Sequence, residues 1–274
     1  MRNMVNYLKR LNLHIKASDM ADPIFSITGK LALVTGSSGG LGEVLAEGLA
    51  RNGAKVIVNG RNPEKVKKTV ANFTEKGYKV IGSVFDVTDG AGVTAAAEKI
   101  IAEAGIPDII VNNAGINPRY PLEDFPEEEW DAVINTNLKS AFLVSKAFAK
   151  GMIERKSGKI INICSLQSEL GRNTIAPYAA SKGGLKMLTR NMATEWARHN
   201  IQVNGIGPGY FKTDMTRALH ENPEFDAWLK NRTPAGRWGD PNELLGALLF
   251  LSSDASSFVN GQLIFVDGGI TAAI

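Results

Sequence analysis

Short apolar runs alternate with longer amphipathic segments along most of the chain. The runs are rich in β-branched residues and almost continuously apolar, which is typical of strands buried on both faces of a sheet. They cover residues 31–35, 55–59, 79–85, 108–112, 159–163, 201–206 and 262–266. Between them, apolar residues recur at helical spacing, most clearly over residues 42–51, 63–76 and 178–198. The alternation predicts an α/β fold with one doubly wound parallel sheet of about seven strands and helices on both faces.

The same pattern favours a single domain over residues 23–274, because no Pro-, Gly- or Ser-rich linker and no repeat divides it. Residues 1–22 begin with a basic stretch, and we interpret them as an N-terminal extension that is disordered or lies upstream of the true start. Residues 211–237 form a long polar, helix-like connection. A connection of that length in a compact domain is typical of a lid or binding loop.

Composition excludes several classes of function. A formal charge of +3 over 274 residues gives no reason to expect a nucleic-acid partner, and no apolar run approaches a membrane span. The single cysteine, Cys164, cannot form an internal disulfide, which favours a reducing compartment and a cytoplasmic location. With that one cysteine and three histidines scattered along the sequence, we predict no metal centre.

A glycine-rich turn follows the first predicted strand and opens a helix. It reads Thr35-Gly36-Ser37-Ser38-Gly39-Gly40-Leu41-Gly42. Glycines permit a tight turn and close approach of backbone N–H groups to a pyrophosphate, and the helix N-terminus then faces the anion. With a strand before it and a helix after it, the turn predicts a dinucleotide site; an ordinary βα turn is the alternative.

The spacing Gly-x-x-x-Gly-x-Gly resembles the short-chain dehydrogenase/reductase family. Further motifs of that family follow in order: Asn112-Asn113-Ala114-Gly115, then Ser165 with Tyr178 and Lys182, then Pro208-Gly209 and Asp267-Gly268-Gly269. The resemblance covers about residues 25 to 272. It implies a Rossmann-like fold, an NAD(P)-dependent oxidoreductase and a homotetramer.

The resemblance and the glycine turn together predict the cofactor-binding residues. They are Gly36, Ser38, Gly40, Leu41, Gly42, Arg61, Asp86, Val87, Asn113, Ala114, Gly115, Tyr178, Lys182, Pro208 and Gly209. By resemblance, Asp86 accepts from the adenine amino group and Val87 packs on the ring; Asp86 can also cap the turn that follows it.

The second predicted strand ends where NAD enzymes usually carry an acid for the ribose 2′-hydroxyl. Here Gly60 takes that place and Arg61 follows, so repulsion against a 2′-phosphate is absent and a guanidinium is available to bind it. We therefore expect NADP to be preferred, with NAD possible. A solvated Arg61 is the alternative, and Gly39 stands where many NADP-using relatives have a second basic residue.

Reduction of a ketone needs a hydride, a proton and stabilisation of the developing oxyanion. Tyr178 and Lys182 are four residues apart in a helical pattern, so they share one face. A cation beside a phenol lowers its pKa, which is near 10 when free, and makes Tyr178 a usable general acid and base. Ser165 can hydrogen-bond the substrate oxygen. We predict Ser165, Tyr178 and Lys182 as catalytic residues.

Two further residues lie next to this set. Asn137 matches the fourth member of the family's catalytic group and by resemblance holds a water that links Lys182 to solvent; Asn135 is the competing position. Cys164 precedes Ser165, and because neighbouring strand residues alternate faces we expect it to point into packing.

The substrate is suggested by longer runs of the sequence. Residues 159–172, 204–211 and 232–240 closely resemble a subfamily that interconverts D-gluconate and 5-dehydro-D-gluconate. A sugar acid needs a cation for its carboxylate and polar groups for its hydroxyls. The predicted substrate residues are Ser165, Tyr178, Arg119, Gln167 and Arg172.

Alternatives remain open for several of these positions. Arg119 can instead form a surface salt bridge with Glu123 or Asp124. Ser168 and Glu169 can meet sugar hydroxyls, and Glu169 can instead pair with Arg172. For the whole chain, the alternatives are a reductase of another ketone, such as a 3-oxoacyl thioester or a cyclic alcohol, and a non-catalytic NAD(P)-binding sensor. The complete set of Ser165, Tyr178 and Lys182 argues against the sensor.

Overall fold

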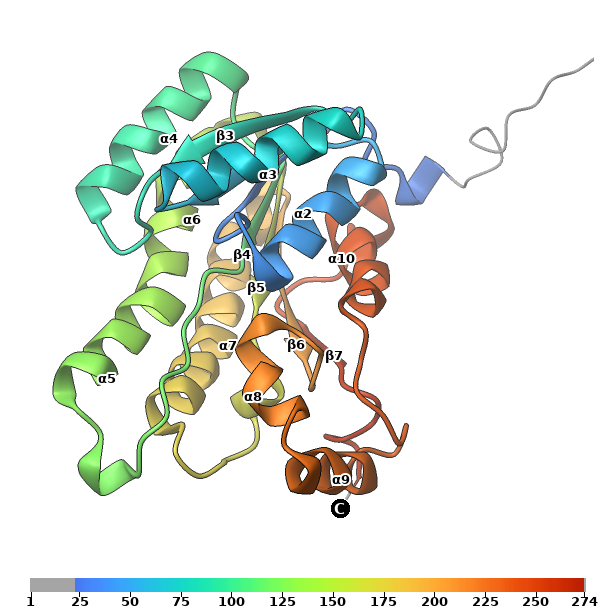
Figure 1. The fold of residues 1–274 in the computed structure, drawn as a ribbon. Coiled ribbons are helices and arrows are strands. Elements are labelled where there is room, and N and C mark those ends of the chain that lie inside the picture. The colour runs from blue at the N-terminus through green and yellow to red at the C-terminus, as the bar shows by residue number, and fades with distance from the viewer. Residues whose placement is uncertain (1–22, 274) are drawn as a thin grey trace, which may run out of the picture.

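The structure is a computed structural model that describes residues 23–273, so the predicted extension over residues 1–22 lies outside the described residues (Figure 1). Within them, one sheet of seven parallel strands has the order β3-β2-β1-β4-β5-β6-β7. The strands are β1 (Leu31–Val34), β2 (Lys55–Gly60), β3 (Val80–Val84), β4 (Ile109–Asn112), β5 (Gly158–Ile163), β6 (Ile201–Pro208) and β7 (Leu263–Val266). The α/β fold class predicted from the alternation is confirmed.

Helices cover both faces of the sheet (Figure 1). One face carries α2 (Gly40–Arg51), α3 (Pro63–Glu75) and α10 (Leu245–Ser252), whose apolar residues share one core with the strands. The other carries α4 (Gly90–Ala104), α6 (Ser140–Arg155) and α7 (Ala176–Trp196), which share a second core. These two layers bury the runs that the sequence marked as strands.

The expectation that every strand is buried on both faces holds for the central strands and is wrong for the edges. Strands β1, β4, β5 and β6 are buried throughout, whereas β3 and β7 are only partly buried. Val84 at the end of β3 is 49% exposed. An edge strand has a neighbour on one side only, so the helices cover it less completely.

The strand order reverses between β1 and β4, because the chain leaves β1 in one direction across the sheet and returns to β4 on its other side. Loops diverge at such a point and leave a crevice at the carboxyl ends of the strands. The long connection after β6 folds into α8 (Arg217–His220) and α9 (Pro223–Arg232), which lie below these ends in Figure 1. The helix-like interpretation of residues 211–237 is thus confirmed.

Candidate active site

The glycine turn between β1 and α2 has a backbone that side chains would obstruct. Gly36 and Gly40 have φ of +62° and +58°, in the left-handed region that favours glycine. A Cβ atom at Gly42 would lie 2.3 Å from the carbonyl oxygen of Gly36 and 2.4 Å from Nδ2 of Asn113. The turn can therefore keep its tight shape, and the N-terminus of α2 faces the crevice.

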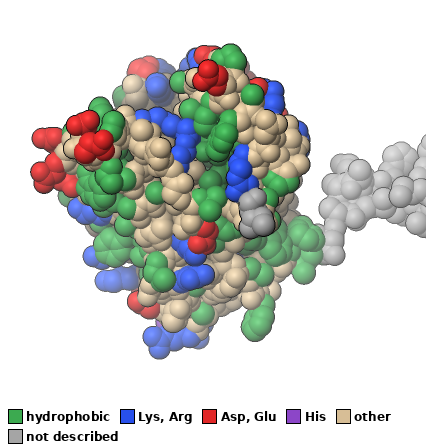
Figure 2. Space-filling model, turned by 90° about the horizontal axis from the view of Figure 1, so that it is seen from below, with side chains coloured by type: hydrophobic (Ala, Val, Ile, Leu, Met, Phe, Trp, Pro, Cys, Tyr) green, Lys and Arg blue, Asp and Glu red, His purple; other side chains and the backbone are tan. Residues whose placement is uncertain are grey.

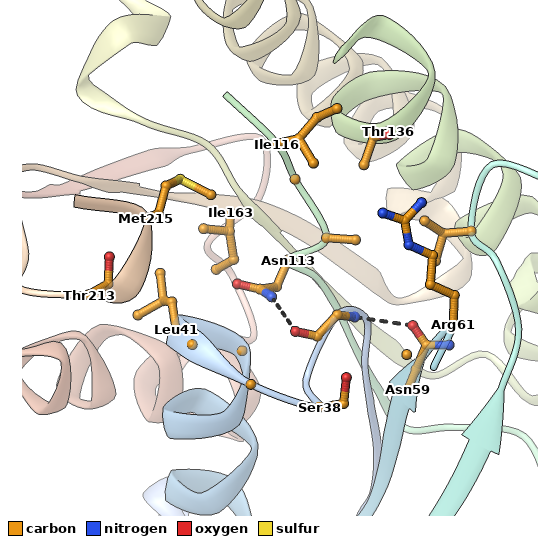
Figure 3. Close-up of a pocket in the computed structure, with 18 of the residues that line it drawn as sticks. Ser38, Leu41, Asn59, Arg61, Asn113, Ile116, Thr136, Ile163, Thr213 and Met215 are labelled. Carbon is orange, nitrogen blue, oxygen red and sulfur yellow. Dashed lines mark hydrogen bonds between the residues drawn. The ribbon is translucent and has the colours of Figure 1, made fainter. Parts of the chain in front are cut away.

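Two buried or half-buried asparagines hold this turn in place, one on each side (Figure 3). Asn59 accepts a hydrogen bond from the Gly36 N–H at 3.1 Å, and its amide donates to the carbonyls of Ser83 and Phe85. Asn113 donates from Nδ2 to the Thr35 carbonyl at 2.9 Å. The sequence predicts Asn113 as a cofactor residue but gives no sign of the role of Asn59, because a single polar residue near the end of an apolar strand has no distinctive pattern.

A cavity of about 430 Å³ opens along the carboxyl ends of the strands from the glycine turn to α7. Figure 2 views the molecule from this side and shows basic side chains close to a strip of hydrophobic ones. All the residues predicted to bind the cofactor line the cavity, including Gly36, Ser38, Gly40, Leu41, Gly42, Arg61, Asp86, Val87, Asn113, Ala114, Gly115, Pro208 and Gly209. Ser165, Tyr178 and Lys182 line its other part.

The end of the cavity next to β2 has Gly60, without a side chain, at the position where an NAD enzyme usually carries its acid. A Cβ atom at Gly60 would lie 2.3 Å from Oγ of Ser38, so a side chain there would displace this serine. Arg61 is largely solvent-exposed, and its Nη1 lies 3.8 Å from Oδ2 of Asp86. Asp86 also accepts hydrogen bonds from the backbone and side chain of Thr88, which lower its pKa. The capping role of Asp86 is thus present, and Arg61 lines the cavity rather than pointing away from it.

The three predicted catalytic residues converge from two elements. Ser165 lies two residues after the end of β5, while Tyr178 and Lys182 lie one turn apart on α7. Nζ of Lys182 donates to the Ile163 carbonyl at 2.6 Å and lies 5.6 Å from the centre of the Tyr178 ring. Strand β5 therefore fixes both the serine and the lysine next to the phenol.

The pKa values of these groups depend mainly on burial. Burial raises the pKa of Tyr178, against the hydrogen bond with Ser165 and the charge of Arg119, which lower it. Burial lowers the pKa of Lys182 to about 8. The expected net lowering of the Tyr178 pKa is therefore wrong for this structure, because desolvation of the phenolate outweighs the nearby charges. Lys182, in contrast, can exchange a proton near neutral pH.

Asn137 lies in a short π-helical segment, Asn135–Lys139, between α5 (Glu127–Ile134) and α6. Its side chain accepts from the Ile116 N–H at 2.8 Å and donates to the Ile116 carbonyl and to Oγ of Ser181. Asn137 is 1% exposed. The π-bulge turns this asparagine toward the loop after β4 and toward α7, so of the two candidates it is the one joined to the catalytic helix.

The residues after Ser165 are engaged within the protein. Oγ of Ser165 donates to Oε1 of Gln167 at 2.5 Å, and Oγ of Ser168 donates to the Lys182 carbonyl at 3.0 Å. Glu169 forms its ion pair with Lys186. The alternative pairing of Glu169 with Arg172 is therefore wrong; Lys186 on α7 lies closer to the carboxylate.

Of the two arginines predicted to meet the substrate, Arg119 lies near enough to Tyr178 and to Arg172 for the charges to interact. Neither arginine is among the residues that line the cavity. Burial and the charge of Arg172 lower the pKa of Arg119, while Tyr210 and Tyr178 raise it. Among residues 23–273, neither arginine forms an ion pair with a carboxylate. The alternative in which Arg119 pairs with Glu123 or Asp124 is thus not realised.

Cys164 is buried beside Ala141 and Leu185, as expected from strand alternation. Burial raises the pKa of its thiol to about 11, so it is a poor nucleophile at neutral pH. Over the described part of the chain, no three His, Cys, Asp or Glu side chains gather into a metal-binding group. None of the helices described is long and apolar enough to span a membrane.

Comparisons with known proteins agree with this geometry. The family model for short chain dehydrogenases matches residues 30–224. The chain is 55% identical over 251 residues to a 5-keto-D-gluconate 5-reductase of Escherichia coli (strain K12), covering 92% of this chain and 99% of that protein. It is 52% identical to a 2-dehydro-3-deoxy-D-gluconate 5-dehydrogenase of Formosa agariphila, covering 93% and 97%.

A solved structure is similar over nearly the whole fold. It is a gluconate 5-dehydrogenase from Burkholderia cenocepacia J2315 in complex with NADP and tartrate. The TM-score is 0.90 at 51% identity, over 92% of this chain and 99% of that one. An NADP complex of a protein this similar agrees with a dinucleotide site in the cavity.

Proposed function

From the premise that this chain belongs to the short chain dehydrogenase family, we propose that it is an NADP-dependent oxidoreductase that interconverts D-gluconate and 5-dehydro-D-gluconate. The observation that carries the proposal is the convergence of Ser165, Tyr178 and Lys182 on the cavity that the glycine turn also lines. A nicotinamide cofactor, when bound, supplies or accepts the hydride. The chain's own residues must then bind the cofactor and the substrate and transfer one proton.

The proton moves at the oxygen of Tyr178. In the reduction, Tyr178 donates its proton to the carbonyl oxygen of the substrate as the carbonyl carbon gains the hydride; in the oxidation, the same atom takes the proton back. Ser165 donates a hydrogen bond to the substrate oxygen and holds it against Tyr178. Its present acceptor, Gln167, must release that hydroxyl, so Gln167 adjusts when the substrate binds.

Lys182 and Asn137 connect Tyr178 to solvent. Lys182, with its pKa lowered to about 8, can return a proton to Tyr178 between turnovers. Asn137 donates hydrogen bonds to the Ile116 carbonyl and to Ser181 of the catalytic helix, which supports a role for it in this path. We propose Asn137 as a relay residue in this path.

Preference for NADP rests on Gly60 and Arg61. Gly60 provides no carboxylate at this end of the cavity, and Arg61 lines the cavity with Asp86 as its ion-pair partner among the described residues. Arg61→Gln should raise the KM for NADPH by roughly tenfold to a hundredfold and leave the KM for NADH unchanged, since only NADPH carries the phosphate. Equal effects on both cofactors would remove this basis for the preference.

Binding of a sugar acid rests on Arg119 and Arg172. The charge of Arg119 interacts with Tyr178, and Arg172 lies close enough to Arg119 for their charges to interact. Neither arginine has a carboxylate partner among the described residues, so both cations are available to an acidic substrate. A pocket for a cyclic alcohol or a fatty 3-oxoacyl chain would have apolar walls here instead. The arginines therefore favour an acid over those alternatives.

A second substrate of the same class is 2-dehydro-3-deoxy-D-gluconate. It is favoured by the likeness to the Formosa agariphila dehydrogenase, at nearly the same identity as the gluconate-type relatives. Both acids carry a carboxylate at C1, so the two arginines do not distinguish them. Initial rates of oxidation, measured in parallel for D-gluconate and for 2-dehydro-3-deoxy-D-gluconate and followed by cofactor absorbance at about 340 nm, decide which acid is preferred. Failure of both acids would contradict the proposal.

A homotetramer and a cytoplasmic location are further parts of the proposal. Helices α5, α6 and α7 each expose a large apolar side chain, namely Trp130, Phe142 and Met187. Exposed apolar residues of this kind favour burial between copies of the chain. The location rests on the single, unpaired Cys164. Light scattering should give four times the mass of one chain, and a monomer would contradict the assembly.

A further inference from the structure

Tyr210 lies at the carboxyl end of β6, directly after Pro208-Gly209, and its ring packs between the sheet and helix α9. The ring centre lies 5.7 Å from that of Phe225 and 6.5 Å from that of Trp228, both on α9, and 5.9 Å from that of Trp238. The contacts are edge-on, a geometry that aromatic pairs prefer. This packing fixes the direction of the Tyr210 hydroxyl.

The hydroxyl of Tyr210 meets the guanidinium of Arg172. Nη1 of Arg172 donates to it at 3.1 Å, and the guanidinium carbon lies 4.6 Å from the centre of the Phe225 ring. Arg172 is half-buried, and within the described residues no carboxylate pairs with it. Its position is therefore set by one tyrosine and one phenylalanine, and its remaining N–H groups, which have no hydrogen-bond partner among the described residues, can bind an anion.

Arg119 lies on the neighbouring loop. The N–H of Tyr120 donates to the Thr174 carbonyl at 3.2 Å, which holds the two arginine-bearing loops side by side. Burial lowers the pKa of Arg119, and the charge of Arg172 lowers it further, while Tyr210 and Tyr178 raise it, so Arg172 lies near enough to Arg119 for their charges to interact. Two like charges repel each other, and an anion that lies between them offsets this repulsion by attracting both. The forked guanidinium suits a carboxylate in that place.

This inference rests on the proposed function. We propose that Tyr210 is a positioning residue that gives the enzyme its selectivity for acids. It holds the guanidinium of Arg172 beside Arg119, so that the two arginines bind the substrate carboxylate while the carbonyl lies at Tyr178. The hydroxyl of Tyr210 acts through Arg172 and takes no part in the proton transfer.

The test compares 5-keto-D-gluconate with L-sorbose, its neutral analogue, in which a hydroxymethyl group replaces the carboxylate. Tyr210→Phe removes the hydroxyl and keeps the ring. It should raise the KM for the acid about tenfold and leave kcat within about twofold. It should leave kcat/KM for L-sorbose unchanged. Tyr120→Phe is the matched control, since the Tyr120 ring packs on Phe125 and its hydroxyl has no hydrogen-bond partner within the described residues. This variant should leave KM and kcat unchanged for both substrates.

A double-mutant cycle separates positioning from general damage. Arg172→Gln should lower the selectivity for the acid further, and adding Tyr210→Phe to it should have no additional effect, because the hydroxyl acts through the arginine. Additive losses, or an equal loss on L-sorbose, would overturn the proposal.

A binding measurement distinguishes this proposal from the proposed function. Calorimetry with tartrate as a carboxylate probe, on protein loaded with NADP, needs no turnover. Tyr210→Phe should weaken tartrate binding about tenfold in the wild-type background and should have no further effect when it is added to Arg172→Gln. If the wild-type protein does not reduce 5-keto-D-gluconate, the proposed function is wrong, and tartrate binding still decides the role of Tyr210. Tartrate binding that is absent, or equal in all variants, would overturn that role.

Discussion

Replacing Asn59 by alanine tests the support beneath the glycine turn. The side chain is 1% exposed and makes three hydrogen bonds to backbone groups, with the Gly36 N–H and with the carbonyls of Ser83 and Phe85. At about 1 kcal/mol of net stabilisation per bond, the substitution should lower the free energy of unfolding by about 3 kcal/mol. The Gly36 N–H also loses its acceptor, so the turn should loosen and bind NADPH roughly tenfold more weakly.

The assay is urea unfolding together with NADPH titration. Asn52→Ala is the matched control, because Asn52 is exposed and lies outside the cavity, and its side chain makes a single hydrogen bond within the described residues, to the Gly48 carbonyl at 2.8 Å. It should cost no more than about 1 kcal/mol and leave NADPH binding unchanged. If Asn59→Ala were as mild as this control in both measurements, the claim that Asn59 holds the turn would be refuted.

Three further predictions follow from the geometry and the charges. Gly42→Ala should weaken the binding of NADPH and of NADH by at least about a hundredfold, because the new Cβ would lie 2.3 Å from the Gly36 carbonyl oxygen. Titration with either cofactor checks this, and an unchanged affinity would contradict the tight turn. Because the pKa of Tyr178 is raised, the phenolate that gluconate oxidation needs becomes more abundant as the pH rises, so kcat/KM for the oxidation should rise between about pH 7 and pH 9. Over the same range kcat/KM for the reduction should stay level. A pH profile for the oxidation that is flat would contradict the role of Tyr178 as the base. Burial lowers the pKa of Lys159 to about 8, so between that value and the ordinary 10.5 the unfolded chain binds the extra proton and the free energy of unfolding rises with pH. The gain in stability from Lys159→Met over wild type should therefore shrink by up to roughly 3 kcal/mol from pH 7 to pH 10, and urea unfolding showing no such change would count against a buried charge at this position.

The sequence was sufficient for the strands and for the main residues of the site. Buried parallel strands are nearly uniform in their apolar character, and the motifs at their carboxyl ends follow them directly, so the glycine turn, Ser165 and Lys182 could be placed before the fold was known. The edges of the sheet were less predictable, because an apolar run does not say whether a neighbouring strand lies on both sides.

Contacts between distant segments were not predictable. Asn59 acts through hydrogen bonds to the backbone of two other elements, and no local pattern signals them. Glu169 has a cation three residues away in Arg172, yet it pairs with Lys186 because helix α7 passes beside it. The raised pKa of Tyr178 likewise follows from burial, which spacing along a helix does not reveal.

The central claim is that Tyr178 transfers the proton in the reduction of a sugar acid by NADPH. The most direct test is the initial rate of NADPH oxidation with 5-keto-D-gluconate, for wild type and for Tyr178→Phe, after NADPH binding has been confirmed for both. The account predicts rapid turnover by wild type and a loss in kcat of at least about a thousandfold in the variant, with NADPH still bound. Undiminished turnover by Tyr178→Phe would contradict the mechanism, and a wild-type enzyme that binds NADPH but leaves 5-keto-D-gluconate unreduced would contradict the substrate.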